Sequence, residues 1–212
     1  DTGGIWAVDF DVLPQVAQAA RMPTRAGALS ARTPRAQSER PKSGVMVIPL
    51  TGVITPQGSF FDFLFGGSGG LAGFREQLAG AVQNDDVTAV VLDVDSPGGL
   101  ADMVPETATM VREARNVKPV VSVVDTTMGS AAYWIGAQAS EVVVSPSGYA
   151  GSIGVYRVHV DASGLNDQLG IKVTYVSAGK YKTEGNSDEP LGRTGTRAWQ
   201  QQVDDVYDDF VR

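Results

Sequence analysis

Hydrophobic residues occur in short, nearly continuous runs, separated by stretches in which they recur every three or four positions. The runs are rich in Val and Ile and cover residues 45–50, 88–94, 119–124, 141–144 and 171–176. Runs of this length are typical of strands buried on both faces. Between them lie two helical stripes, Leu71, Phe74, Leu78 and Val82, and then Val104, Ala108 and Val111. The alternation predicts an α/β fold, a mostly parallel sheet with right-handed helical crossovers.

The two ends of the chain have other patterns. Apolar spacing from Ile5 to Ala20 predicts a short helix. Residues 21–42 hold six basic residues and three prolines without hydrophobic periodicity, which favours a solvated linker over a binding arm. The last stretch predicts an amphipathic helix through Trp199, Val203, Val206, Tyr207 and Phe210. We therefore divide the chain into a helical segment (1–20), a basic linker (21–42) and a main domain (43–212).

Residues 56–73 do not fit the alternation. Four of the seven Phe residues stand here, followed by four Gly in five positions. Apolar bulk beside flexible backbone is unusual for an exposed loop. A lid or substrate wall and a subunit contact are both compatible with the pattern.

Composition excludes several classes of protein and site. The 212 residues are 42% hydrophobic, enough for one domain with a real core. A net charge of −7 argues against a general nucleic-acid binder. The absence of Cys and the single His leave no thiolate or multi-His metal site. Asp93 and Asp95 lack further ligands nearby, and no nucleotide-binding glycine motif is present, so we expect neither a metal nor a cofactor.

The sequence also gives expectations about where the protein is located and whether the chain is part of a longer protein. No run approaches the roughly 18 apolar residues of a membrane span, and the first residues lack a signal-peptide pattern. We therefore expect an intracellular chain without a membrane partner. It begins without Met and ends abruptly, which is compatible with a piece of a longer protein.

Candidate chemistry lies in the loops that follow the predicted strands, because ligand sites of α/β sheets lie beyond the carboxyl ends of strands. Ser96-Pro97-Gly98-Gly99 follows one strand, and Gly129-Ser130 follows the next. Paired glycines allow close backbone approach, although a tight turn explains them equally well. Ser130 precedes a helix-forming run, where an N-cap serine is the ordinary explanation and a nucleophile the alternative.

A serine nucleophile needs a base, and the candidates are few. His159 lies in an alternating stretch that predicts a strand, where a lone His is usually packed. Lys118, Lys172, Lys180 and Lys182 are the lysines beyond the linker. Lys180 and Lys182 follow the run 171–176 and share a face if the strand continues, although solvated surface lysines are the common case.

Three motifs in this order resemble the signal peptide peptidase A family of Ser-Lys serine peptidases: LDVDSPGG, MGSAAYWIGAQASEVVVSPSGYAGSIGV and GIKVTYVSAGKYKTEGN. Within that family the chain is most similar to bacteriophage head-maturation (prohead) proteases. The resemblance covers about residues 43–212 and implies a Clp protease/crotonase-like spiral of mostly parallel strands with flanking helices. It implies Ser130 as nucleophile and Lys182, 52 positions later, as base. The resemblance also favours Lys182 over Lys180, because the Gly-x-x-Lys pattern of that family matches Gly179 to Lys182 here.

The resemblance also implies the rest of the site. The N–H groups of Gly99 and Ala131 would form the oxyanion hole. An extended peptide would lie against Gly98, Leu100, Gly151, Ser152 and Ile153, adding a strand to the sheet. The expected substrate is a scaffold or capsid protein, cut in the prohead in the cytoplasm of an infected bacterium by a homo-oligomeric ring.

Four alternatives remain open at this stage. One is a cellular peptidase that degrades signal peptides, and another uses His159 as the base for Ser130. An acyl-CoA enzyme of the crotonase type would have the same fold without either residue. The last is an inert head-assembly module that binds scaffold protein, which would predict a damaged dyad.

A lysine base works only when it is neutral. Desolvation is the usual means of lowering a lysine pKa from about 10.4 toward the working pH. We therefore predict that Lys182 is largely buried with its amine near Ser130, and that activity rises with pH through the alkaline range.

Overall fold

The computed structural model describes residues 5–8, 44–58 and 70–212. The chain divides into two compact units, residues 7–154 and residues 155–212 together with 1–6. We call them the sheet unit and the C-terminal unit. The boundary near residue 154 falls inside the predicted main domain, 43–212. The Phe-rich stretch lies mostly outside the described residues, as do the linker and most of the N-terminal segment.

The sheet unit is built on four parallel strands. They lie side by side in the order β2 (Gly44–Ile54), β3 (Val87–Leu100), β4 (Val120–Gly129) and β5 (Glu141–Val144). The short strand β6 (Tyr149–Gly151) pairs in parallel with the last part of β4. The α/β class with a mostly parallel sheet is therefore confirmed.

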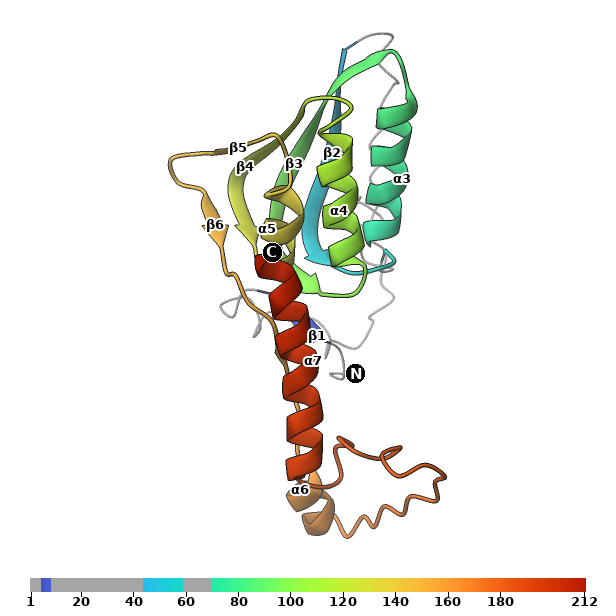
Figure 1. Cartoon of the computed structure of the whole chain (residues 1–212). Coiled ribbons are helices and arrows are strands. Elements are labelled where there is room, and N and C mark those ends of the chain that lie inside the picture. The colour runs from blue at the N-terminus through green and yellow to red at the C-terminus, as the bar shows by residue number, and fades with distance from the viewer. Residues whose placement is uncertain (1–4, 9–43, 59–69) are drawn as a thin grey trace, which may run out of the picture. The chain divides into compact units, whose positions relative to one another are not determined.

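Three helices cover one face of this sheet (Figure 1): α3 (Gly70–Gln83), α4 (Val104–Ala114) and α5 (Ala131–Gly136). The first predicted stripe is mostly buried there, with Leu71, Phe74 and Leu78 at most 1% exposed, whereas Val82 is half-buried. Val104, Ala108 and Val111 are fully buried. These side chains pack on alternate residues of the strands, such as Ile48, Leu92 and Val124.

The prediction of strands buried on both faces is wrong for two of the four strands. Val45 and Val47 of β2 are 51% and 53% exposed, and the three valines of β5 are 38–45% exposed. Among the described residues of this unit, the helices cover only one face, and β5 is an edge strand. Four of the five hydrophobic runs therefore correspond to strands, but two of these strands have one face that the described residues leave exposed.

The C-terminal unit pairs the first residues of β1 (Ile5–Val8) with β7 (Tyr156–Arg157) in antiparallel fashion. A strand therefore stands where the sequence predicted the start of a helix. Then come α6 (Ser163–Gln168) and the long α7 (Arg193–Val211), which confirms the predicted amphipathic helix. Phe210 of α7 is 8% exposed.

The strand predicted at 171–176 is absent. These residues have no regular structure and are exposed, up to 98% at Val176. An extended segment becomes a strand only where another strand pairs with its backbone. The pairing described in this unit, β1 with β7, does not reach these residues. No helix in the described part of the chain is long and apolar enough to cross a membrane.

Candidate active site

Ser130 has a backbone conformation that side chains rarely adopt. It connects β4 to α5 with φ 52° and ψ −113°, and its side chain is 1% exposed. Conformations of this kind cost about 1–3 kcal/mol in a non-glycine residue and are found mainly at functional sites. The Ser130 N–H donates to the Gly151 carbonyl at 2.8 Å, which ties this turn to β6.

The hydroxyl of Ser130 does not cap the helix that follows. Ser130 occupies the N-cap position of α5, yet its side chain makes no capping hydrogen bond. Its Oγ instead lies 3.4 Å from the Gly154 carbonyl, at the long limit of a hydrogen bond. The ordinary explanation of this serine from sequence, an N-cap, therefore does not account for its hydroxyl.

The end of β3 that contains the paired glycines, residues 96–99, lies directly beside Ser130, and we call it the glycine turn. A Cβ on Gly129 would be 3.0 Å from the Pro97 carbonyl oxygen, and Ser96 pairs with Met128 across the two strands. The Gly98 N–H donates to the Ser96 hydroxyl at 3.1 Å, so it is already used within the chain. Among the paired glycines, Gly99 is therefore the better candidate for a donor to substrate.

The bare backbone of Gly99 has a reason that the sequence did not reveal. A Cβ there would be 2.0 Å from the carbonyl oxygen of Ile54 on β2, so any side chain is excluded. Gly98 has φ 96°, which glycine adopts without strain. Gly99 is thus required by its packing against β2 and Gly98 is favoured by its backbone conformation, whether or not a substrate faces them.

The residues predicted to bind substrate lie on two sides of this site. Gly151 pairs with Gly129 through β6, and Ser152 has a left-handed φ of 60°. Ile153 is 51% exposed, and Leu100 ends β3 half-buried. Gly151 is therefore placed beside Ser130, and the binding roles of all these residues stay predictions.

Lys182 belongs to the C-terminal unit, in a series of turns over residues 178–185. Its N–H donates to the Gly179 carbonyl at 3.2 Å. The prediction of a largely buried side chain is wrong for this structure, because Lys182 is exposed. The strand predicted at 171–176, which Lys182 would have followed, is not formed either.

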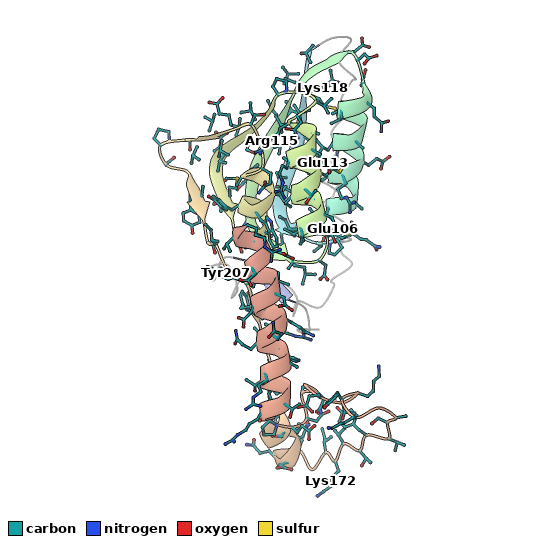
Figure 2. The ribbon with its side chains drawn as sticks, in the orientation of Figure 1. Glu106, Glu113, Arg115, Lys118, Lys172 and Tyr207 are labelled. Atoms are coloured by element: carbon teal, nitrogen blue, oxygen red, sulfur yellow. The ribbon has the colours of Figure 1, made fainter. Side chains whose placement is uncertain are left out.

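The other candidate bases are occupied or lie in solvent. Lys118 donates from Nζ to the carbonyls of Ala81 and Asn84, at 2.9 and 2.6 Å, and so caps the end of α3 (Figure 2). Lys180 lies over the ring of Tyr181, 5.1 Å from its centroid. Lys172 is exposed.

His159 is a packed residue, as its sequence context suggested. Its Nε2 lies 2.7 Å from the Asn186 carbonyl, which can only accept, so Nε2 carries the proton. The imidazole also meets the Trp199 ring edge-on, at 5.8 Å between centroids. A nitrogen that donates to a backbone carbonyl is poorly suited to accept a proton from a serine.

The turns that carry Lys182 are fastened to α7. The Glu184 carboxylate accepts the Gly195 N–H at 2.8 Å, in the first turn of the helix. A Cβ on Gly185 would be 2.5 Å from the Trp199 ring, so Gly185 packs directly against it. Arg157 stacks on Trp199 at 4.0 Å. These contacts have no signal in the sequence, because contacts between distant segments leave no local pattern.

Asp188 fastens the preceding stretch of chain. It accepts hydrogen bonds from the Asn166 amide at 2.9 Å and from the Tyr175 hydroxyl. The bond to the carboxylate raises the pKa of Tyr175, because it favours the protonated phenol. Irregular residues 171–188 are thereby connected to α6.

The two aspartates considered for a metal have other surroundings. Asp95 accepts a hydrogen bond from the Thr126 hydroxyl on β4, and Asp93 is exposed on the open face of the sheet. No group of three His, Asp or Glu side chains within the described ranges could hold a metal ion.

Comparison with known proteins finds one matching family model and several related proteins. Residues 112–212 match the model of peptidase family S49, a span that contains both Ser130 and Lys182. The head-tail preconnector protein GP5 of Enterobacteria phage P21 is 33% identical over 163 residues, 76% of this chain and 32% of that protein. Capsid assembly protease C of Escherichia phage lambda is 26% identical over 72% of this chain and 34% of its own length.

Similarity extends beyond phages. A putative protease of Methanocaldococcus jannaschii is 36% identical over 61% of this chain and 42% of its own length. The chain thus spans about a third to two fifths of these relatives. Among solved structures, a mutant of the membrane-bound stomatin-specific protease 1510-N has a TM-score of 0.37 at 18% identity, over 50% of this chain and 46% of that one.

Proposed function

We propose that the chain, of which residues 112–212 match the model of peptidase family S49, is a serine endopeptidase in which Ser130 is the nucleophile and Lys182 the general base. The observation that carries the proposal is the strained backbone of Ser130, combined with a buried hydroxyl that does not cap α5. Such strain is retained where the position of a side chain matters more than local stability.

In the proposed reaction, Ser130 Oγ attacks the peptide carbonyl carbon while Lys182 accepts the hydroxyl proton. The carbonyl oxygen becomes negative and is held by the N–H groups of Gly99 and Ala131. The C–N bond then breaks, and Lys182 returns the proton to the leaving amine. A water molecule hydrolyses the acyl-serine ester and regenerates Ser130. Loss of one oxyanion donor typically costs about 3–4 kcal/mol of transition-state stabilisation.

Lys182 can act as the general base only in surroundings that favour its neutral form. Lys182 must be neutral in the active form, and an exposed ammonium is stabilised by water. We propose that Lys182 loses this exposure when the active site is assembled around a substrate. Activity should then rise with pH through the alkaline range, as more enzyme carries a neutral amine.

The proposed substrates are the proteins of an assembling phage head, and the proposed location is the prohead in an infected bacterium. Support comes from two relatives, whose names describe a head-tail preconnector and a capsid assembly protease. The proposed active form is a homo-oligomeric ring.

The test is cleavage of an unfolded protein substrate, followed by intact mass and by SDS gels. Ser130→Ala and Lys182→Ala should each lower kcat at least about 1,000-fold. Lys180→Ala is the matched control, because it removes a lysine of the same turns, and it should retain activity within about threefold. Loss of cleavage in His159→Ala together with an active Lys182→Ala would refute the assignment of the base.

A further inference from the structure

Ser96 is one of four buried polar side chains among the described residues, the others being Thr107, Ser122 and Ser130. Its hydroxyl is fully buried at the end of β3. It donates to the Gly52 carbonyl at 2.6 Å and accepts the Gly98 N–H at 3.1 Å. One hydroxyl thus connects the backbone of β2 to the glycine turn beside Ser130.

These bonds occur where the sheet is irregular. The pairing of β2 with β3 shifts between Thr51 and Val53, and that of β3 with β4 shifts between Val94 and Ser96. The backbone ladder is therefore interrupted on both sides of the turn. A side-chain hydrogen bond supplies the constraint that regular pairing provides elsewhere in the sheet.

The constrained residue, Gly98, is one of the two glycines of the turn. Gly98 has φ 96° and no side chain, and its ψ sets the direction of the next N–H group, that of Gly99. Beyond the shift, Gly98 pairs with Val53 and Gly99 with Ile54 of β2, and the Ser96 hydroxyl adds to this pairing by holding the Gly98 N–H. Gly129, which directly precedes the nucleophile Ser130, packs against Pro97 of the same turn, so a shift of the turn would be felt at Ser130.

We propose that Ser96 is a positioning residue of the peptidase: its hydroxyl fixes Gly98, and thereby aims the Gly99 N–H at the developing oxyanion. This role rests on the function proposed above. The oxyanion contact forms fully only in the transition state, so the loss of Ser96 lowers kcat and leaves KM nearly unchanged. Ser96 itself does not touch the substrate.

The matched control is Ser122, a second fully buried serine, on the neighbouring strand β4. Its hydroxyl donates to the Gly136 carbonyl at 2.8 Å, away from the glycine turn. Ser96→Ala and Ser122→Ala each remove a buried hydroxyl from the same sheet and should lower the melting temperature comparably. Only Ser96→Ala should lower kcat, by about 10- to 100-fold, with KM within about twofold.

A second variant of Ser96 and a second measurement test the same role independently. Ser96→Cys keeps a similar shape but forms weaker hydrogen bonds, so its kcat should lie between wild type and alanine. Hydrogen exchange of the Gly98 amide should accelerate at least tenfold in Ser96→Ala relative to Ser122→Ala. Equal kcat losses in both alanine variants, or unchanged exchange at Gly98, would overturn the positioning role.

The proposed function is judged separately. If the wild-type protein shows no cleavage that depends on Ser130, the peptidase assignment is wrong. The claim that Ser96 directs the Gly99 N–H toward an oxyanion is then wrong as well. The exchange measurement then decides whether Ser96 fixes the turn at all. If wild type cleaves and Ser96→Ala cleaves equally well, only the role of Ser96 is wrong.

Discussion

At the scale of single residues, the strain at Ser130 is maintained by contacts on both sides. Its N–H is held by Gly151, and its carbonyl accepts the Trp134 N–H at 2.9 Å, which starts α5. Gly129, just before it, is pressed against the Pro97 backbone. A strained residue persists only where its neighbours determine its conformation in this way.

We predict that Gly129→Ala separates the two halves of the oxyanion hole. The new methyl would be 3.0 Å from the Pro97 oxygen, so the turn carrying Gly99 must move away from Ser130. Unfolding free energy should fall by about 1–3 kcal/mol, and kcat should fall at least tenfold. Denaturant titration and peptide cleavage measure the two effects.

Gly80→Ala is the control for that substitution. Gly80 lies inside α3, and a Cβ on it would have no neighbouring atom within 4 Å, so the methyl meets open space. This variant should gain about 0.5–1 kcal/mol of stability and keep its kcat. A Gly129→Ala enzyme with unchanged kcat would show that the contact with Pro97 does not set the geometry.

At the scale of elements, the sequence predicted those that carry a strong local pattern. The strands β2 to β5 were predicted because their Val-rich runs are continuous, and α7 because its apolar face recurs along the helix. The run 171–176 is also rich in β-branched residues, but none of the described strands pairs with it, and pairing is a property of the fold rather than of the run.

The site was predictable to a similar degree. Ser130 and the glycine turn follow predicted strands, so their position at the end of the sheet follows from strand order. Ser96 carried no signal of its own, because its partners are a carbonyl 44 residues earlier and an amide two residues later. The anchoring of the turns by Glu184 and Trp199 likewise depends on tertiary contacts.

We predict that the fastening of the Lys182 turns to α7 is required for activity, and Gly185→Ala tests it. The new Cβ would be 2.5 Å from the Trp199 ring, at a residue with φ 79°. Trp199 cannot withdraw easily, since Arg157 stacks on it. The turns must therefore shift, and kcat should fall at least tenfold.

Gly170→Ala separates this clash from backbone strain. Gly170 has a similar φ of 68°, but open space around it. Both variants should lose about 1–2 kcal/mol through the left-handed conformation, and Gly185→Ala should lose about 1–3 kcal/mol more. Equal stability and equal kcat in the two variants would contradict the fastening.

At the scale of the whole molecule, Ser130 and Lys182 belong to different compact units, so the proposed dyad depends on how the chain assembles. Each unit leaves apolar side chains exposed among its described residues. In the C-terminal unit, Ile171, Val173 and Tyr175 are 46–49% exposed. Exposed apolar groups in such density are typical of surfaces that are covered in an assembly.

We therefore predict that the chain is oligomeric in solution and that residues 171–176 contribute to the contact. Sedimentation should give a mass several times that of one chain, and Val173→Asp should shift it toward the monomer with a matching loss of cleavage. Thr174→Asp adds the same charge to the neighbouring polar residue, which removes no apolar side chain, and should dissociate the assembly less. A wild-type monomer that cleaves at full rate would remove the proposed ring. Equal dissociation by both substitutions would mean that charge, rather than an apolar contact through Val173, disrupts the assembly.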